Sequence, residues 1–254
     1  MLTQAYFNLS SLLPLAAADL EADNLAQAYA PGSFGIYVDA YGPRFLQYIK
    51  NADSIALTLG MFVARAADVT KSAVTSGTTS SVTTSGLTAD AHVGKVLIDE
   101  TAAVAGAAPE GESGIIVSNS TTLIKIDPAY PFSVAPGADN VRIRSVFHGI
   151  ANASATVKSR DVLGAVVAAN GISVGNFGWV QFGGVHPLAK NLTNAAITNG
   201  AAVIGTTTAG AANVSSSSGV DILLGRALCT IASTNAGKNP MDIRCNIFGT
   251  FVTT

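Results

Sequence analysis

From Phe34 onward, the sequence is a succession of short runs rich in β-branched and aromatic residues, separated by Gly, Pro, Asn and Asp. Runs of this kind are typical of β-strands, and the residues between them are typical of turns. The runs that predict strands are Phe34–Val38, Arg44–Lys50, Met61–Arg65, Val93–Ile98, Gly114–Ser118, Thr121–Ile126, Val141–Arg144 and Asp242–Ile247. In the last two runs apolar and polar residues alternate, as in strands with one buried and one solvated face. The sequence therefore predicts an all-β fold.

The first thirty residues have a different composition from the rest of the chain. Ala16–Ala30 is rich in Ala and also contains Leu and Glu, which favour helices, and the Pro31–Gly32 pair that follows is a typical helix end. We expect one short helix here, preceded by an apolar arm, Tyr6–Leu15. This arm can either reach onto a neighbouring molecule or fold back on its own domain.

The length of 254 residues suits one large β domain or two ordinary ones. Two segments of low complexity, residues 70–89 and 206–219, are rich in Ser and Thr, and we interpret the first as an exposed hairpin and the second as a loop. Small polar residues at 151–159 favour a boundary there. We expect an N-terminal arm (1–32), a β domain (33–150) with the hairpin at about 70–90, and a C-terminal β-barrel domain (151–254); each β unit is a small barrel or sandwich.

Few residues in this chain carry a charge. Charged residues make up 12% of the sequence, hydrophobic residues make up 48%, and the net charge is −2. Scattered Lys and Arg exclude the basic stripe of a nucleic-acid-binding protein, and the sequence contains no run of about 20 apolar residues to span a membrane. Since no Lys or Arg precedes the apolar stretch Leu9–Leu20, we expect no signal peptide. A chain with so few charges leaves apolar surface that must be covered. We expect other copies of the chain to cover it, in an oligomer or in a larger protein lattice.

One segment matches a catalytic motif. Gly171–Gly175 reads Gly-Ile-Ser-Val-Gly, the G-x-S-x-G pattern of the nucleophile elbow in α/β-hydrolases. In that fold the serine is followed by a helix, then by an acidic residue and a histidine in chain order. Here a strand pattern follows, and no acidic residue lies between Ser173 and the only later histidine, His186. We interpret the motif as a turn that matches by chance.

The remaining polar residues give no pattern of a catalytic, cofactor or metal site. His92 and His148 are isolated, and neither lies near the cluster of His, Cys or carboxylate ligands that a metal requires. Glu110 and Glu112 lie in a Gly/Pro loop and Asp99–Glu100 ends a strand, so we expect these carboxylates to be solvated. We expect Cys229 and Cys245 to be buried free thiols. The sequence thus favours a protein that is not an enzyme.

Val162–Ala232 resembles the C-terminal barrel of decoration (cement) proteins from the capsids of tailed bacteriophages. The segments that carry the resemblance are Phe177–Gln181, Gly183–Val185, Ala209–Gly210 and Leu224–Ala227, with Ile197, Gly200 and Val203 between them. Upstream, the sequence patterns of Phe34–Met61 and Gly111–Val134 also resemble those of these proteins. The motifs are short and contain no catalytic signature.

The resemblance implies a virion structural protein, made in the host cytoplasm, that binds the major capsid protein on the outside of the shell and stabilises it. Proteins of this kind often bind as trimers, so we expect a homotrimer. The candidate interface residues are Tyr6, Phe7, Leu12, Leu13, Leu15, Phe177 and Trp179. Trp179, the sole tryptophan, is either a core residue or an interface anchor. The alternative function is a surface-recognition β module of a phage tail or fibre that binds host carbohydrate.

Overall fold

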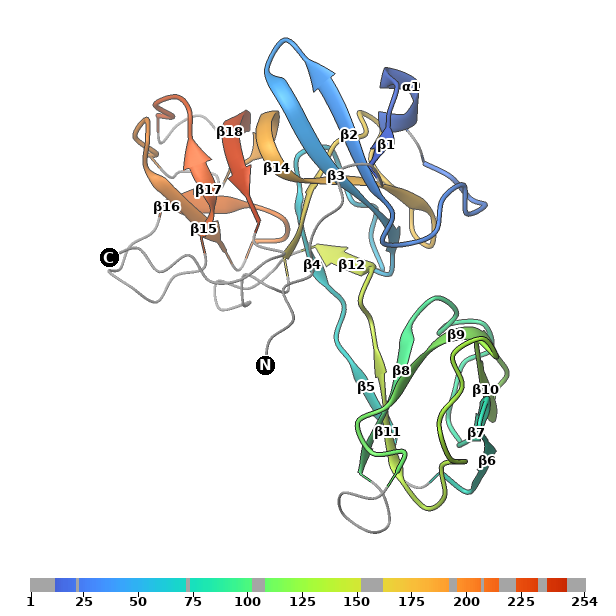
Figure 1. Ribbon diagram of the computed structural model, residues 1–254. Helices are drawn as coiled ribbons and strands as arrows, with labels where there is room; N and C mark the ends of the chain where they lie inside the picture. The colour runs from blue at the N-terminus through green and yellow to red at the C-terminus, as the bar shows by residue number, and fades with distance from the viewer. Residues whose placement is uncertain are drawn as a thin grey trace. The chain divides into compact units, whose positions relative to one another are not determined.

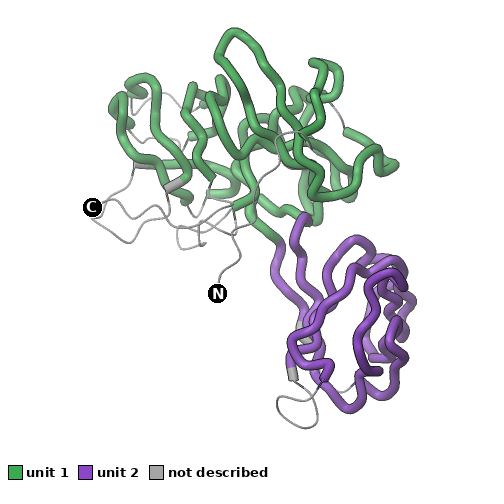
Figure 2. The backbone as a smooth tube through the Cα atoms, in the orientation of Figure 1, with its two compact units in different colours: residues 1–65, 148–254 green, residues 66–147 purple. Residues whose placement is uncertain are grey.

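The computed structural model describes residues 12–21, 23–71, 74–101, 108–151, 162–191, 196–206, 208–214, 223–232 and 237–245. Within these ranges the chain is nearly all β, with a single helical turn, α1 (Ala17–Leu20) (Figure 1). The predicted all-β class with one short helix is confirmed. The chain forms two compact units: residues 1–65 and 148–254 make unit 1, and residues 66–147 make unit 2 (Figure 2).

Unit 1 contains one sheet of 11 strands, whose order is β1-β2-β3-β12-β4-β13-β14-β18-β17-β15-β16. The strands are β1 (Leu13–Pro14), β2 (Phe34–Asp39), β3 (Gly42–Asn51), β4 (Phe62–Arg65), β12 (His148–Ala151), β13 (Val162–Val166), β14 (Phe177–Lys190), β15 (Ala202–Gly205), β16 (Ala212–Val214), β17 (Leu223–Ala227) and β18 (Lys238–Arg244).

The sheet of unit 1 closes on itself twice. Because β3 also pairs with β14, the strands β3, β12, β4, β13 and β14 form a first closed ring. A second ring runs through β14, β18, β17, β15 and β16, and a parallel bridge between Ala212 and Asn191, the residue after β14, closes it. The 14-residue strand β14 therefore belongs to both rings.

Each ring has its own apolar interior. The first is filled by side chains from all five of its strands, including Ile49, Val63, Ala151, Val166 and Val180. The second is filled by buried residues that include Phe182, Val203, Leu224, Met241 and Ile243. Both interiors are built mostly from aliphatic side chains, in keeping with the low aromatic content of 7%.

An aromatic cluster lies on the outer face of the first ring, where Trp179 on β14 is directly opposite Tyr48 on β3. Their ring centroids are 5.0 Å apart, and Tyr29 lies 5.2 Å from Trp179. The N-terminal segment covers this cluster with Leu15 and Leu20. In the residues described, the arm therefore folds back on its own unit.

The predicted helix over Ala16–Ala30 is wrong in length, since α1 is one turn. Backbone pairing with β14 replaces the rest of it. The N–H of Asn24 donates to the carbonyl of Phe177 at 3.0 Å, and the N–H of Phe177 donates back to Asn24 at 2.9 Å. These long-range bonds outweigh the local helix preference of an Ala-rich segment.

Unit 2 contains one sheet of seven strands in the order β5-β11-β8-β9-β10-β7-β6. The strands are β5 (Val69–Lys71), β6 (Ser76–Thr78), β7 (Ser81–Thr83), β8 (Val96–Thr101), β9 (Ser113–Asn119), β10 (Leu123–Ile126) and β11 (Asn140–Arg144). The two edge strands, β5 and β6, are consecutive in the chain, and the segment from Lys71 to Ser76 spans at most about 18 Å. The sheet therefore curls until its two edges approach each other; we call this place the seam.

The contacts divide the chain differently from the expected ranges 1–32, 33–150 and 151–254. Residues 34–65 pair with β13 and β14, so they belong with the C-terminal strands. Unit 2 is an insertion between β4 and β12, which pair antiparallel with each other. The Ser/Thr-rich hairpin is present as β6 and β7, where Val82 is fully buried and Ser76 and Thr78 are exposed.

Candidate functional site

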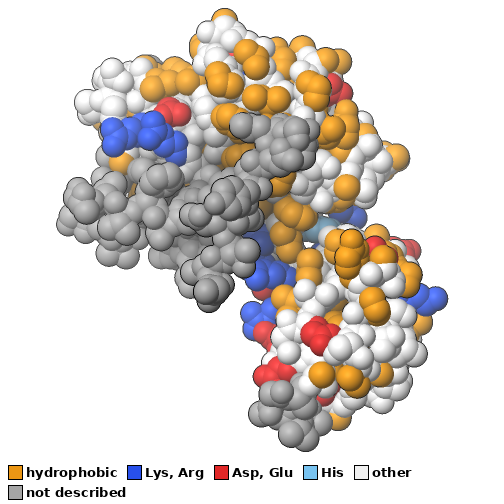
Figure 3. All heavy atoms as spheres, viewed as in Figure 1, with side chains coloured by type: hydrophobic (Ala, Val, Ile, Leu, Met, Phe, Trp, Pro, Cys, Tyr) orange, Lys and Arg blue, Asp and Glu red, His pale blue; other side chains and the backbone are white. Residues whose placement is uncertain are grey.

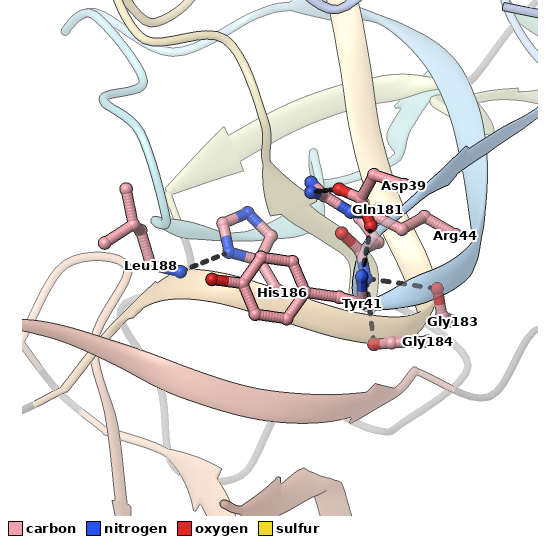
Figure 4. A network of polar contacts seen from close by, with 8 residues as sticks. All are labelled: Asp39, Tyr41, Arg44, Gln181, Gly183, Gly184, His186 and Leu188. Atoms are coloured by element: carbon pink, nitrogen blue, oxygen red, sulfur yellow. Dashed lines mark hydrogen bonds and ion pairs between the residues drawn. The ribbon is translucent and has the colours of Figure 1, made fainter.

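The strand shared by the two rings carries a buried polar network (Figure 4). The Gln181 side chain is fully buried, and its Nε2 donates to the carbonyls of Gly183 at 3.1 Å and Gly184 at 2.8 Å. The pairing of β14 with β3 shifts register between Gln181 and Gly183. Gly184 has φ +87°, and a Cβ there would lie 2.4 Å from the carbonyl oxygen of Pro43. Gln181 thus satisfies backbone carbonyls at the irregularity where β14 passes from one ring to the other.

An ion pair lies at the end of the β2–β3 hairpin in the same network. The Arg44 guanidinium bonds the Asp39 carboxylate, and the N–H of Tyr41 donates to Asp39 at 2.8 Å. Arg44 also lies over the Tyr37 ring, 5.5 Å from its centroid. Burial lowers the pKa of Arg44, and Tyr37 partly offsets that effect. These contacts fix the shape of the hairpin tip.

His186 is the buried histidine of this network. Its Nδ1 accepts the N–H of Leu188 at 3.1 Å, so Nε2 carries the proton and donates to the carbonyl of Val166 at 2.9 Å. Burial lowers the pKa of His186 to about 4. The ring is neutral at pH 7 and both nitrogens are engaged, which leaves no lone pair for a metal or for general-base catalysis.

The G-x-S-x-G segment attaches the N-terminal segment to unit 1. The Ser173 hydroxyl donates to Asp23 at 2.6 Å, and the Ser173 N–H donates to the other carboxylate oxygen at 2.8 Å. The Asn176 side chain adds a third bond, at 2.9 Å. Partial burial opposes ionisation of Asp23, but these bonds outweigh it and lower the pKa of the carboxyl. Strand β14 follows the motif, so its context is a turn before a strand and not the strand–helix elbow.

The candidate interface residues have different environments. Tyr6 and Phe7 lie outside the described residues. Leu13, on the edge strand β1, is 36% exposed, while Leu12, Leu15 and Phe177 are partly buried. Trp179 is fully buried against Tyr29 and Tyr48, which favours the core alternative for this side chain.

Other polar residues are engaged or buried. The backbone N–H of His92 bonds Asn119, its ring contacts Lys95 at 3.4 Å, and His148 is buried on β12. Glu112 is bonded by the N–H and hydroxyl of Ser133. Cys229 is partly buried and Cys245 is buried; both are free, and burial raises the pKa of Cys245 to about 12.

The expectation that the carboxylates near residue 99 are solvated is wrong for Asp99. This side chain is fully buried on β8. The pattern Val96-Leu97-Ile98-Asp99 contained a usable signal, because Asp99 points to the same face of the strand as the core residue Leu97.

The sequence interpretation also missed a group of exposed apolar residues. Ile115 and Val117 on β9 are 52% and 47% exposed, and Val38 and Tyr41 at the β2–β3 hairpin are 67% and 56% exposed. Hydrophobic side chains are visible among uncharged polar ones on the surface (Figure 3). In β9 the signal was the run Ile-Ile-Val, which places apolar residues on both faces of one strand.

Among the described residues, no three His, Cys, Asp or Glu side chains gather closely enough to bind a metal. Within the same part of the chain, no helix has the length and apolar character needed to cross a membrane. Comparison with protein-family models, with curated proteins and with solved structures finds no match to this chain.

Proposed function

We propose that this chain is a non-enzymatic structural protein of a virion, a capsid decoration protein that binds the outer surface of the assembled shell. It binds there as a homo-oligomer, with a trimer favoured, and its partner is the major capsid protein. The proposal rests on the resemblance of Val162–Ala232 to such proteins and on the exposed apolar side chains of the two units.

The observation that carries the proposal is the outer face of β9. Ile115 and Val117 point away from the core of unit 2, and Val96 on β8 lies directly opposite Ile115. Strand β9 pairs with β8 on one side and β10 on the other, so its backbone is held in place. Apolar side chains fixed in this way lose little conformational entropy when a partner covers them, and covering them removes apolar area from water.

The β2–β3 hairpin in unit 1 supports the same conclusion. Its tip presents Val38 and Tyr41 to solvent, while the ion pair between Arg44 and Asp39 holds the turn. A tyrosine on a rigid support is a frequent anchor of protein interfaces. Each unit therefore offers its own apolar contact.

The mechanism of stabilisation is linkage. A protein that binds the assembled shell and not its free subunits stabilises assembly in proportion to RT ln(1 + [L]/Kd). Contacts from several copies in one oligomer add through avidity. The polar side chains described above support a non-enzymatic role. Both ring nitrogens of His186 and the hydroxyl of Ser173 already form hydrogen bonds to other groups of unit 1.

The carbohydrate-binding alternative is favoured by one feature, the hydroxyl-rich β6–β7 hairpin. Thr78 Oγ1 and Ser81 Oγ lie 2.8 Å apart on an exposed turn. Hydroxyl groups on a rigid β scaffold are suited to bind a sugar, and a glycan panel tests this alternative directly.

Co-sedimentation with purified expanded capsids, with the oligomeric state measured by light scattering, tests the proposal. We expect an oligomer that binds capsids, and we expect the double variant Ile115→Ser/Val117→Ser to bind at least about tenfold more weakly. Val174→Ser, at another exposed apolar residue, is the matched control and should bind like the wild type. A monomer that binds glycans and no capsid would overturn the proposal.

A further inference from the structure

The outer face of strands β14, β18 and β17 in unit 1 carries an excess of positive charge. On β18, Met241 and Ile243 point into the core of the second ring. The alternate residues Lys238, Asp242 and Arg244 therefore point away from that core. Asp242 is the only acidic residue in the three strands, and Arg244 bonds one of its oxygens through two nitrogens, at 2.7 and 2.8 Å. Lys and Arg side chains are visible over β17 and β18 (Figure 3).

Two more cations belong to this face. Lys190 on β14 is in register with Lys238, and Arg226 on β17 is in register with Asp242. Like charges directly opposite each other in a sheet are unfavourable. Burial, followed by the charge of Lys238, lowers the pKa of Lys190, whose ammonium group donates to the carbonyl of Ala209 at 2.9 Å. Arg226 is exposed and forms no ion pair with any residue that the structure describes. The strands thus hold more positive charge than they compensate.

Exposed leucines lie among these cations. Leu188 is two residues before Lys190, and Leu228 is two residues after Arg226, so each leucine shares the outer face of its strand. The N–H of Leu228 donates to the carbonyl of Pro240 on β18 at 3.1 Å, which places it beside that strand. A phosphate backbone would contact the charges and leave the leucines uncovered, whereas a protein surface can cover both. We call the four cations with the two leucines the basic face.

Unit 2 has the opposite charge and presents a complementary surface. Its sequence contains eight Asp and Glu against five Lys and Arg. On the loop of residues 127–134, Tyr130 and Val134 are 70% and 50% exposed. Asp127 lies on the same loop and Glu112 is bonded to it, and neither carboxylate forms an ion pair within the described chain. We call this loop with Glu112 the acidic loop.

The acidic loop is held in one conformation. Phe132 is buried in the core of unit 2 and anchors the middle of the loop. The N–H of Ser133 donates to Glu112 at 2.7 Å, and the Asp127 side chain accepts the N–H of Ala129 at 2.9 Å. Hydrogen bonds from Ser133 lower the pKa of Glu112, so its carboxylate is ionised at neutral pH. A loop ordered in advance loses little conformational entropy when it binds.

We propose that the acidic loop of one copy binds the basic face of a second copy of this chain. Tyr130 covers the exposed leucines, as aromatic side chains often do at the centre of an interface, and the carboxylates of Asp127 and Glu112 meet the surrounding cations. The contact joins two different surfaces, so it is head-to-tail and can close into a ring such as a trimer. This inference rests on the homo-oligomer of the proposed function and names the surfaces that build it.

Light scattering of the full chain over a range of concentrations tests the contact. We expect an oligomer in about 50 mM salt, and we expect its dissociation constant to rise at least about tenfold in about 500 mM salt, because salt screens charges at an exposed rim. Tyr130→Ser, which changes no charge, should also weaken the oligomer at least about tenfold. A wild type that is monomeric in low salt would overturn the proposal.

Lys238→Glu separates the contact from the stability of unit 1. It removes a cation from the basic face, so the dissociation constant of the oligomer should rise at least about tenfold. It also replaces the like-charge pair with Lys190 by an opposite-charge pair, so unit 1 should resist denaturant at least as well as in the wild type. Lys125→Glu is the matched control, because Lys125 is exposed on β10 and lies outside the basic face. Equal weakening by the two variants would show that net charge alone is responsible, against the proposal.

Cross-linking of the wild-type protein tests the same contact without a substitution. A carbodiimide joins a lysine to a carboxylate that it touches, and an equal mixture of isotope-labelled and unlabelled chains identifies links between copies. We expect links of mixed isotope composition between Lys238 and either Glu112 or Asp127. Their absence from the oligomer would refute the proposed pairing of surfaces.

Co-sedimentation with capsids, run in parallel, distinguishes this inference from the proposed function. An oligomer that passes these tests and binds no capsid supports the contact and overturns the capsid role. A monomer that binds capsids overturns the contact and leaves the capsid role standing. Loss of capsid binding in Lys238→Glu with no change in oligomer mass would mean that the shell occupies the basic face, and it would overturn the contact between copies.

Discussion

The two units bury polar groups in different ways. In unit 1, Gln181 and His186 are neutral side chains that bond the backbone of β14 and its neighbours. In unit 2, Asp99 is an ionisable side chain with no hydrogen-bond donor. The bonds that Gln181 and His186 make to the backbone persist at neutral pH, whereas burial raises the pKa of Asp99 to about 6. The titrations of His186 in unit 1 and of Asp99 in unit 2 should therefore change the stability of the two units in opposite directions as pH falls.

The units also differ in how they close. Unit 1 closes two rings that share β14, so damage to that strand reaches both interiors. Unit 2 brings its two edges together at the seam, and none of its strands belongs to a ring of unit 1. Variants in one unit should then leave the other folded.

The largest effect is expected at the crossing point of the rings. Gly184→Val forces a β-branched residue into φ +87° and places Cβ against the backbone carbonyl of Pro43, 2.4 Å away. We expect unit 1 to lose more than about 3 kcal/mol of unfolding free energy. Fluorescence of Trp179, the sole tryptophan, reports denaturant unfolding of unit 1.

Gly200→Ala is the matched control for this variant. Gly200 has φ +81° but open space around the Cβ position, so the change tests backbone strain alone. It should cost only about 1 kcal/mol. Equal losses at the two glycines would show that the close approach to Pro43 does not matter, and loss of hydrogen-exchange protection in unit 2 would contradict the independence of the units.

The next effect is acid destabilisation of unit 1. The pKa of His186 is about 4, below its ordinary value of 6.5, so the unfolded chain binds a proton before the folded one does. Stability is therefore full above about pH 6.5 and falls as pH drops toward 4, by about 2–3 kcal/mol. Through the titration of His186, acid weakens unit 1. Through the titration of Asp99, whose pKa is raised to about 6 by burial, acid strengthens unit 2.

Denaturant midpoints followed by Trp179 fluorescence from pH 4 to 7.5 test the response of unit 1. His186→Gln, whose amide is neutral throughout, should flatten the profile between pH 4.5 and 6.5. His92→Gln, in unit 2, should leave it unchanged. A wild-type profile that rises toward pH 4.5 would show that His186 does not control the acid limb.

The smallest effect is expected at the attachment of the N-terminal segment. Asp23→Ala removes three hydrogen bonds to Ser173 and Asn176 and should weaken the docking of this segment by about 1–2 kcal/mol. Iodide should then quench Trp179 more strongly, while unit 2 stays protected. Glu21→Gln keeps a carbonyl oxygen for the Ala169 N–H and is the control. Unchanged quenching in Asp23→Ala would mean that other contacts hold the segment.

Local features of the sequence predict much of the fold. Strand β9 spans Ser113–Asn119 where Gly114–Ser118 was expected, and β11 spans Asn140–Arg144 where Val141–Arg144 was expected. The alternation of apolar and polar residues, and the turn residues that bound a strand, each involve only a few consecutive positions. Such strands can therefore be predicted from local sequence. The capsid role stays a prediction, since it rests on a resemblance.

What the sequence did not reveal depends on contacts between distant residues. The helix predicted to Ala30 ends at Leu20 because Asn24 pairs with Phe177, more than 150 positions away. The first ring closes because β14 pairs with β3, with Trp179 opposite Tyr48, and no local sequence pattern predicts this register. Asp99 comes near the loop that contains Asp139 because β8 pairs with β11, a long-range pairing that no local pattern indicates.

The insertion of unit 2 makes one demand on whatever stands between β4 and β12. Arg65 ends β4 and is in register with Gly149 on β12, so the points where the chain departs and re-enters are neighbours on adjacent antiparallel strands. A tight hairpin turn would bridge them without disturbing the first ring. Residues 66–147 thus leave and re-enter unit 1 at one place in its sheet. A different module whose two ends lie side by side would satisfy the same geometric requirement at this position.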